Sequence, residues 1–381
     1  MPTQRRDREV CEVPCRPTPE KEAPKKRLRR SILRVGSDFA GLDTAAWALR
    51  ILGIPFEHTF AADKDPSSFK VLSYMGAKTI YRDVTTRPAT EAPSVDLYTF
   101  GPPCQPFSAA GNRLSTATPD GVLALHSLTY IKHHQPSMIL MEQVPDVLSL
   151  APDLVNLLFQ ELAALGYSLS SEILASNKYG VPQKRERLFL VGVKNPVEPF
   201  VFPAEVPLWP IRNLIAPLPP GNFAVLPSAG IGISAQKVAN VTSHIEGAVA
   251  EGVDPFERAV FVSAGASKRW SHKSVDEVMT LTKTEAARQG YWCSLKGGFL
   301  DTDDVGVLQG FPRDLIPWRD LDISSPQQAG LYGNAMNLAV MLHLIPHVLC
   351  SAGFLSPAAM NKKLKYARDY DPGIRYLPGA V

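Results

Sequence analysis

One cysteine of this chain lies in a segment that restricts the backbone around it. Residues 101–108 are Gly-Pro-Pro-Cys-Gln-Pro-Phe-Ser, so a glycine and two prolines precede Cys104. A cysteine presented on a stiff loop becomes a nucleophile when its pKa is lowered, because the thiolate is the reactive form. A buried structural cysteine is rarely set among so many prolines. The segment therefore predicts covalent chemistry at Cys104.

A carboxylate and a pair of arginines further along the chain suit the binding of a polar substrate. Glu142 follows the apolar run 138–141, and a carboxylate at a strand end can serve as an acid and hydrogen-bond partner. Arg185 and Arg187 lie two residues apart, and in a strand this spacing puts both side chains on one face. A solvated run of charges is the alternative for residues 183–187 taken alone.

Three further loops carry residues that suit a nucleoside-like ligand. Residues 37–42, Ser-Asp-Phe-Ala-Gly-Leu, form a small turn whose backbone amides can meet a polar group together with a helix N-terminus. The acid of Asp63-Lys64 suits a ribose diol, and Asp83-Val84 occupies the equivalent place after the next strand. Each acid taken alone is equally suited to capping a helix. Together the loops predict a nucleoside-shaped cofactor lying across a sheet.

The elements that position these residues alternate between short apolar strands and helices. This alternation predicts an α/β fold with a Rossmann-like, doubly wound and mostly parallel sheet. Ligands of such sheets bind at the carboxyl ends of the strands, where the residues named above fall. The expected strands span residues 32–35, 56–61, 79–81, 95–100, 138–141, 167–175 and 187–193, and the expected helices span residues 42–52, 67–74, 122–132 and 154–165.

Changes in composition divide the chain into five parts. Residues 1–30 are rich in proline and charge and are expected to form a disordered basic tail. Residues 31–194 are the expected catalytic and cofactor-binding domain. The proline-rich start of residues 195–325 predicts a smaller, irregular second domain. Residues 326–355 are expected to return to the catalytic domain through a helix at 334–349, and residues 356–381 to fray as a tail.

Composition excludes several classes of protein. With 45% hydrophobic and 20% charged residues, the 381-residue chain can bury a core, which excludes a wholly disordered protein. Five scattered cysteines argue against a disulfide scaffold and for a reducing compartment. No apolar run approaches the ~20 residues of a bilayer span, so no membrane partner is expected. His343 and His347 lack a third ligand, so no metal site is expected.

The net charge of +3 is unevenly distributed. Residues 1–30 hold ten Lys/Arg and five Asp/Glu, which leaves 30 basic and 32 acidic groups for the rest of the chain. A nucleic-acid binder with such a body needs a local basic groove, or the tail, to meet phosphates. Residues 24–30, Pro-Lys-Lys-Arg-Leu-Arg-Arg, fit a nuclear-import signal, a phosphate-binding arm or a solvated extension. The expected location is the nucleus, with the cytoplasm as the alternative.

The order of the motifs resembles that of the cytosine-C5 DNA methyltransferase family. Residues 101–108 are similar to the complete nucleophile loop of that family, and residues 183–187 to its Gln-x-Arg-x-Arg motif. Residues 308–312, Leu-Gln-Gly-Phe-Pro, and 333–335, Gly-Asn-Ala, resemble its two late motifs, and Phe39-Ala40-Gly41 resembles its cofactor loop. The resemblance covers most of the chain, with residues 195–280 unmatched.

The resemblance implies a class I methyltransferase fold with a target-recognition region in the smaller domain. It implies an enzyme, acting as a monomer, that moves a methyl group from S-adenosylmethionine to C5 of cytosine in double-stranded DNA. Cys104 would add to C6 of a base flipped out of the duplex, Glu142 would hydrogen-bond N3 and the exocyclic amine, and Arg185 and Arg187 would hold the base and its backbone. The residues implied to hold S-adenosylmethionine are Phe39, Ala40, Gly41, Leu42, Asp63, Lys64, Asp83, Val84, Pro103, Leu123, Asn334 and Ala335.

Three places depart from the family pattern. Ser37-Asp38 stand where the family has Asp-Leu, and Asp43-Thr44 replace a pair of glycines. Gln143 replaces an asparagine that would brace the cysteine loop. Residues 303–307, Asp-Asp-Val-Gly-Val, replace Arg-Glu-Cys-Ala-Arg, so that two basic contacts near DNA are lost.

Two other functions compete with DNA methylation. A tRNA-modifying branch shares the catalytic residues, but it carries Cys-Phe-Thr where this chain has Thr280-Leu281-Thr282, which favours DNA. A catalytically silent DNA-binding relative is the other alternative, and the intact catalytic residues argue against it. A dehydrogenase on the same fold is disfavoured because no Gly-x-Gly-x-x-Gly motif is present.

Overall fold

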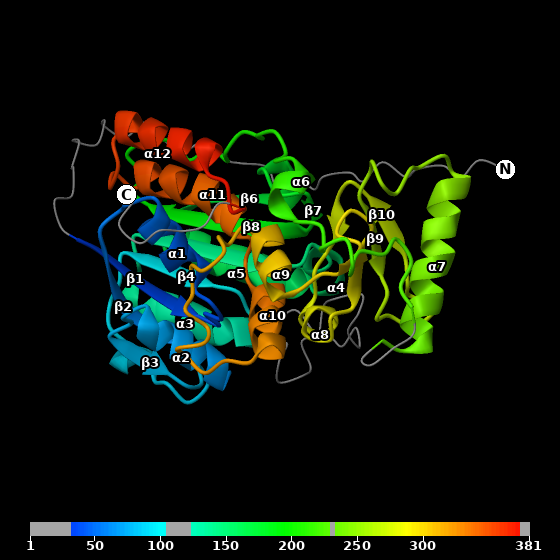
Figure 1. The fold of residues 1–381 in the computed structure, drawn as a ribbon. Coiled ribbons are helices and arrows are strands. Elements are labelled where there is room, and N and C mark those ends of the chain that lie inside the picture. The colour runs from blue at the N-terminus through cyan, green and yellow to red at the C-terminus, as the bar shows by residue number, and fades with distance from the viewer. Residues whose placement is uncertain (1–31, 104–122, 229–232, 374–381) are drawn as a thin grey trace.

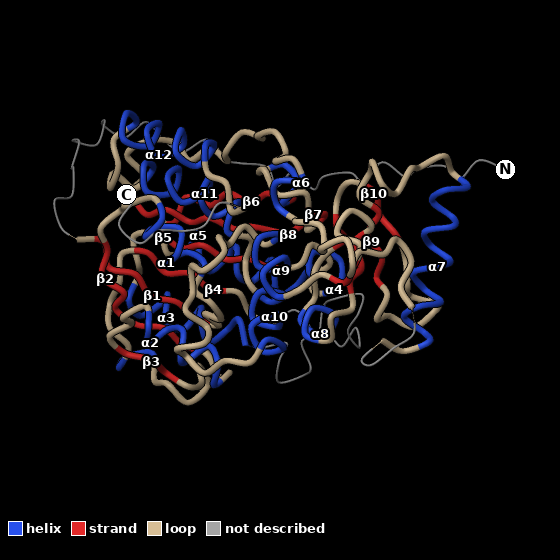
Figure 2. The backbone as a smooth tube through the Cα atoms, viewed as in Figure 1, coloured by secondary structure: helices blue, strands red, loops and turns tan. Residues whose placement is uncertain are grey.

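The computed structural model describes residues 32–103, 123–228 and 233–373. Cys104 and the basic tail therefore lie outside the described residues. Figure 1 shows a large sheet with helices on both faces, and beside it a smaller sheet that carries one long helix on its outer side. The same arrangement appears in Figure 2, where the strands run through the middle of the larger part.

The large sheet has seven strands in the order β3-β2-β1-β4-β5-β8-β6. All pairs are parallel except those of β8, which runs antiparallel to both β5 and β6. The central strands read as nearly continuous apolar runs because helices cover both faces. The strands are β1 (Leu33–Asp38), β2 (Phe56–Ala62), β3 (Thr79–Tyr81), β4 (Leu97–Phe100), β5 (Met138–Gln143), β6 (Tyr167–Ala175) and β8 (Glu186–Lys194). The predicted α/β class with a mainly parallel sheet is confirmed.

Two layers of helices bury the sheet. On one face, α1 (Thr44–Ile51), α2 (Pro66–Tyr74) and α11 (Leu338–Ser351) enclose the larger hydrophobic core, which includes the fully buried Trp47. On the other face, α3 (Leu123–His134) and α5 (Pro152–Ala164) enclose a second core around Phe60 and Tyr98. The short helix α4 (Val147–Leu150) leads into α5. This distribution is what a doubly wound sheet requires, and the predicted helices exist within a few residues of their expected bounds.

The smaller sheet is antiparallel and has the order β10-β9-β12-β13. Its strands are β9 (Val260–Ser263), β10 (Lys273–Val275), β12 (Tyr291–Cys293) and β13 (Gly298–Phe299). Helix α7 (Ala235–Ala250) covers one face, where its Val241 and Ile245 form a separate core with Trp292 of β12. The other face joins the large core through Phe261 and Cys293. A two-stranded parallel link of β7 (Gln183–Lys184) and β11 (Val278–Met279) connects the two parts, and α8 (Lys283–Ala287) follows it.

The smaller sheet spans fewer residues than the predicted second domain at 195–325. Helices α6 (Ile211–Leu214) and α9 (Thr302–Leu308) contribute Leu214 and Val305 to the large core. The chain after β8 also returns to α11, since the Val197 N–H donates to the Ser351 carbonyl at 2.8 Å. Apolar residues spaced among the prolines explain why both ends of this range pack on the larger part.

The C-terminal region confirms one expectation and corrects another. The helix predicted at 334–349 is present as α11, which begins at Leu338 because the Asn337 side chain caps it by accepting from the Ala339 and Val340 amides, and a separate helix α10 (Ser325–Asn334) precedes it. The expected frayed tail also forms helix α12 (Pro357–Asp369), which packs along α11 (Figure 1) and is followed by the buried Tyr370. Among the described residues no single helix is long and apolar enough to cross a membrane, although the bent pair α10 and α11 has that length and composition when taken together.

Candidate active site

The carboxyl ends of the parallel strands meet at one edge of the large sheet. Asp38 at the end of β1 is in register with Ala62 of β2 and with Phe100 of β4, and Phe100 is in register with Met141 of β5. The direction of strand order reverses between β1 and β4, which is where open α/β sheets bind their ligands. The loop after β1 and the loop that leads to Cys104 both begin at this switch point.

The loop after β1 has an unusual backbone. Phe39, Gly41 and Asp43 have φ values of 55°, 55° and 49°, in the left-handed region. The Asp63 carboxylate holds this loop, since Oδ2 accepts from the Gly41 amide and Oδ1 from the Asp65 amide, both at 2.8 Å. Burial raises the pKa of Asp63, and the two amide bonds oppose that shift. Asp63 therefore ties the end of β2 to the predicted cofactor loop.

Three of the predicted cofactor residues form one small apolar surface. Val84 and Leu123 are buried against Ala62, and the partly buried rings of Phe39 and Tyr81 pack on them. These residues come from four different segments, so only the fold brings them together. Two of the other predicted residues differ in exposure, since Leu42 is fully buried and Lys64 is exposed.

Asp83 forms a turn rather than capping a helix. Its Oδ1 accepts from the amide and the hydroxyl of Thr85, both at 2.8 Å. The backbone hydrogen bond, followed by the hydroxyl bond, lowers the pKa of Asp83. The turn fixes the neighbouring Val84 in the apolar surface.

The Glu142 carboxylate lies between the two predicted arginines. Its Oε1 is 3.3 Å from Arg187 Nε and 3.9 Å from Arg185 Nη2. Glu142 lies within β5 instead of after it, in register with Phe189 of β8. Both guanidinium groups therefore reach one carboxylate, a contact that the sequence did not predict.

The two arginines differ in what else they contact. Arg185 is buried and donates to the carbonyl oxygens of Leu281, Gly333 and Ala335 at 3.3, 3.3 and 2.9 Å. Within the described residues the Arg187 side chain donates one hydrogen bond, to the adjacent Glu186 carbonyl at 2.7 Å. Arg185 thus joins the two halves of the chain, while Arg187 has fewer structural ties.

The start of the cysteine loop lies beside Glu142. A Cβ atom at Gly101 would lie 3.3 Å from Met336 Cε and 3.8 Å from Glu142 Oε2, so the glycine leaves room for both side chains. The Gln143 amide donates to the Pro102 carbonyl at 3.2 Å and accepts from the Val144 amide at 2.8 Å. Gln143 therefore braces this loop even though the family has asparagine here. Pro103 is the last described residue before Cys104.

The late motifs close the site from the C-terminal side. Gln183 donates to the Leu308 carbonyl at 3.2 Å, and Gln309 donates to the Tyr332 carbonyl at 2.9 Å. The Thr44 hydroxyl donates to the Met336 carbonyl at 3.2 Å, which sets the segment after α10 against the cofactor loop. Asn334 is exposed at the end of α10, and Ala335 is buried with its carbonyl on Arg185.

The structure also shows why the chain departs from the family pattern at Asp43. This residue caps α1, accepts from the Ser37 hydroxyl at 2.6 Å and lies 2.9 Å from His58 Nε2. Burial alone would raise the pKa of Asp43, but its interactions with His58 and Ser37 lower it below the ordinary range. His58 and the pairing of Ser37 with Asp43 were not predicted from the sequence, because no spacing rule connects these residues.

Asp38 has a different set of partners. Arg87 donates to both of its carboxylate oxygens at 2.6 and 2.9 Å, and Tyr98 donates at 2.5 Å. The Arg87 guanidinium also lies over the rings of Phe60, Tyr81 and Tyr130. This buried pair fixes the loop after β3 to the end of β1, and nothing in the sequence pointed to Arg87.

The acidic stretch 303–307 serves internal pairing. Asp304 accepts from Lys296 at 2.5 Å and from Arg313 at 3.3 Å, and it closes a capping box with Asp301 at the start of α9. The positive charges that pair with this acidic stretch therefore come from Lys296 and Arg313, which lie outside it.

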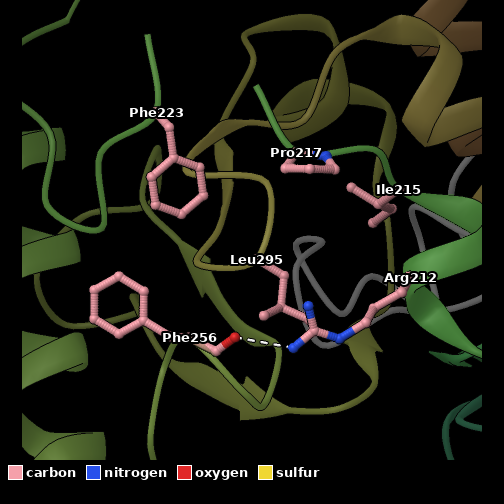
Figure 3. A pocket seen from close by; sticks show the side chains of 6 residues that line it. All are labelled: Arg212, Ile215, Pro217, Phe223, Phe256 and Leu295. Atoms are coloured by element: carbon pink, nitrogen blue, oxygen red, sulfur yellow. Dashed lines mark hydrogen bonds between the residues drawn. The ribbon is translucent and has the colours of Figure 1, made fainter. Parts of the chain in front are cut away.

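A pocket of about 180 Å³ lies away from these residues. Arg212 of α6 crosses it to donate to the Phe256 carbonyl at 2.9 Å, which is the dashed line in Figure 3. Its lining residues are Arg212, Ile215, Pro217, Phe223, Phe256 and Leu295. None of the predicted site residues that the structure describes lines it.

The sheet order, the switch-point loops and the helices on both faces define a class I methyltransferase fold. Two solved structures agree with this class: an Entamoeba histolytica methyltransferase, EhMeth, at 13% identity and a TM-score of 0.59, and the S. pombe Dnmt2 methyltransferase at 20% identity and a TM-score of 0.57. Each comparison covers 84% of this chain and 98% of the other chain.

Within that class the family is defined by sequence. Residues 33–243 match the model of the C-5 cytosine-specific DNA methylases, and the chain belongs to this family. The predicted resemblance is thereby confirmed. The family implies methyl transfer that depends on S-adenosylmethionine.

Curated relatives of the family differ in how much of their length is matched. The orphan methyltransferase M.SPRI of Bacillus phage SPR is 30% identical over 166 residues, which are 42% of this chain and 38% of that protein. M.Rho11sI of Bacillus phage rho11s is 29% identical, with 43% of this chain and 33% of that protein matched. The type II methyltransferase M.NgoBI of Neisseria gonorrhoeae is 26% identical over 80% of this chain and 89% of its own length. The matched segment therefore spans about a third of the length of the two phage enzymes.

Proposed function

We propose that this chain transfers a methyl group from S-adenosylmethionine to C5 of cytosine in DNA, through a covalent bond between Cys104 Sγ and C6 of a flipped base. The observation that carries this proposal is the place of Glu142. Its carboxylate lies between Arg187 and Arg185 and beside Gly101, three residues before Cys104.

The thiol and the carboxylate have separate tasks in this reaction. C5 of cytosine is a poor nucleophile, and addition of the Cys104 thiolate to C6 makes it electron-rich. The Glu142 carboxyl group accepts from the exocyclic amine and shares a proton with N3, which stabilises charge on the ring. After methylation, loss of the C5 proton and elimination of the thiolate restore the double bond and free the enzyme.

The arginines orient these groups. Arg187 Nε is 3.3 Å from Glu142 and holds the carboxylate, Nη1 donates to the Glu186 carbonyl, and Nη2 is available to the base or its phosphate. Arg185 positions the same carboxylate from the buried side, since it is fixed to three backbone carbonyl oxygens. The base must leave the stack to reach this site, at a cost of a few kcal/mol.

The residues present fit S-adenosylmethionine, which supplies an electrophilic methyl group when bound. Phe39, Val84 and Leu123 offer an apolar surface to its adenine. Each Asp63 carboxylate oxygen already accepts one amide and keeps further lone pairs for the ribose hydroxyls. Burial of this carboxylate beside the apolar surface favours a ligand that pairs with it.

DNA is the proposed substrate in preference to tRNA. The family model is that of DNA methylases, and residues 280–282 lack the Cys-Phe-Thr of the tRNA-modifying branch. The test is methyl transfer from labelled S-adenosylmethionine to mixed DNA and tRNA, followed by bisulfite sequencing of the products. Labelled cytosine in DNA is the expected result, and label in tRNA alone would overturn the choice of substrate.

Cys104→Ala tests the covalent step. We expect this variant to lose methyl transfer and to keep its affinity for S-adenosylmethionine, because the thiol acts on the base. Calorimetry measures the affinity, and turnover is measured with the labelled cofactor. Retention of wild-type turnover would contradict the role of Cys104.

A further inference from the structure

The loop between β9 and β10 presents the most exposed tryptophan of the chain. Of the five tryptophans, Trp47 and Trp292 are buried, Trp209 and Trp318 are partly buried, and Trp270 is 67% exposed. An indole ring left in water forgoes burial of one of the largest apolar surfaces available to a side chain. The Trp270 ring is therefore accessible to a partner, and the residues around it indicate whether one binds there.

The charges around Trp270 indicate the kind of partner. Lys268, Arg269 and His272 are exposed beside it, and no acidic residue occurs from 259 to 275. Within the described residues neither Lys268 nor Arg269 forms a salt bridge, whereas Lys273 pairs with Glu251 at 2.8 Å. The Arg269 guanidinium lies 5.5 Å from the centre of the Trp270 ring. An aromatic ring among unpaired cations is the combination that binds a base and its flanking phosphates.

The base of this loop is held firmly. Asn240 of α7 donates to the carbonyl oxygens of Ala264 and Ala266, both at 2.9 Å. The Ser271 hydroxyl donates to the Ser263 carbonyl at 2.8 Å, and the Trp270 amide donates to the Ser267 carbonyl at 2.8 Å. A rigid base lowers the entropy cost of using the loop tip for binding.

A chain of hydrogen bonds connects the loop to Arg185. The amides of Ala264 and Gly265 donate to the Gly290 carbonyl at 2.7 and 2.9 Å. The neighbouring Tyr291 hydroxyl accepts from the Thr282 amide at 3.0 Å. Leu281 directly precedes Thr282, and its carbonyl accepts from Arg185 at 3.3 Å. The loop therefore emerges from the end of the small sheet that is joined to the Glu142 site.

We propose that residues 267–272 form a nucleic-acid contact in which the Trp270 indole stacks on a base of the DNA held at the Glu142 site, while Lys268 and Arg269 pair with the adjacent phosphates. The proposal rests on the proposed function, since the DNA is the substrate of that reaction. It assigns the substrate contact to a loop that none of the catalytic motifs includes. It also supplies a local basic surface to a body whose residues after 30 carry slightly more acidic than basic groups.

The test compares full-length variants in their binding to a short cytosine-containing duplex, with tRNA measured in parallel. Trp270→Ala is expected to weaken duplex binding about tenfold or more, and Trp270→Phe to retain most of the affinity because a phenyl ring still stacks. The matched control is Phe256→Ala, which removes another exposed ring, 58% exposed, at the opposite end of β9. This control is expected to bind as the wild type does.

Two further measurements separate stacking from charge. Joint replacement of Lys268 and Arg269 by alanine should reduce the slope of log affinity against log salt by about two units. Trp270 fluorescence should be quenched by the duplex and shielded from iodide. In turnover, Trp270→Ala should raise the KM for DNA and leave that for S-adenosylmethionine unchanged.

The outcomes distinguish this proposal from the proposed function. If the wild type methylates DNA and Trp270→Ala binds and turns over equally well, the loop assignment is wrong and the proposed function stands. If the Trp270 effect appears with tRNA and not with DNA, the assignment to DNA is wrong. If the wild type neither binds nor methylates DNA, the proposed function itself fails.

Discussion

The Gln143 side-chain amide donates a hydrogen bond to the Pro102 carbonyl oxygen at 3.2 Å, two residues before Cys104. The same amide group accepts from the Val144 backbone at 2.8 Å, so its orientation is fixed from both ends. A strand-end side chain thereby ties β5, which carries Glu142, to the loop that carries the proposed nucleophile.

Gln143→Ala should lower turnover about fivefold, because loss of one buried hydrogen bond of ~1 kcal/mol loosens the start of the cysteine loop. Cofactor affinity should stay unchanged, since the hydrogen bonds of the Gln143 side chain to described residues go to Pro102 and Val144 and not to the loop after β1. Gln143→Asn is the control, because it keeps an amide donor of the kind that the family carries. Steady-state turnover and calorimetry together check this, and an Ala variant as fast as wild type would show that the brace has no effect.

Arg187→Lys should lower turnover about tenfold or more, which corresponds to ~1.4 kcal/mol, because lysine keeps the charge and loses the planar fork. Arg187→Ala should be impaired at least as much, and overall DNA affinity should change little in either variant. If Arg187 contributes only its positive charge, the Lys variant will turn over as fast as the wild type. That result would show that the planar guanidinium does not position the base.

Arg185→Lys should instead reduce stability. Its guanidinium donates to three backbone carbonyl oxygens from two distant segments, and one ammonium group has no fork to satisfy all three. We expect a loss of about 2–4 kcal/mol in the free energy of unfolding, on the scale of broken buried hydrogen bonds to a charged group. Denaturant unfolding measures it, with Arg187→Lys as the matched control that should unfold like the wild type.

Asp63→Ala should weaken S-adenosylmethionine binding by about 1–3 kcal/mol, the scale of lost hydrogen bonds to a charged group. The structure adds a second cause, because Asp63 also holds the Gly41 amide of the cofactor loop. Asp63→Asn is the matched variant, since its single carbonyl oxygen can keep only one of the two backbone bonds. Calorimetry that finds wild-type affinity in Asp63→Ala would remove this residue from the site.

Asp43 makes stability depend on pH. Its folded-state pKa is lowered below the ordinary value of 3.8, so its contribution is present above that value and is lost as the pH falls through the folded pKa. Asp43→Asn keeps the helix cap and should flatten the acid limb of the stability curve. Unfolding of both proteins from neutral to acid pH measures the difference. Parallel curves would show that the Ser37–Asp43–His58 contacts do not control acid stability.

The sequence by itself determined the alternation of strands and helices, because strands buried under two helical layers must be apolar over their whole length. It also determined which residues stand at the strand ends, and hence that Asp63, Glu142 and the two arginines belong to one site. Spacing along a strand predicted that Arg185 and Arg187 face the same side, whereas their common approach to Glu142 was found only in the structure.

Only the tertiary structure decided how that site is supported. Asp43 meets His58, Asp38 meets Arg87, and Asp304 meets Lys296 through side chains that no periodicity relates, because the partners lie on different elements. The different roles of Arg185 and Arg187 also depend on carbonyl oxygens near residues 281 and 333–335, which only folding brings to the end of β8. Local patterns record which face of an element is buried, while long-range pairing depends on the packing of the whole chain.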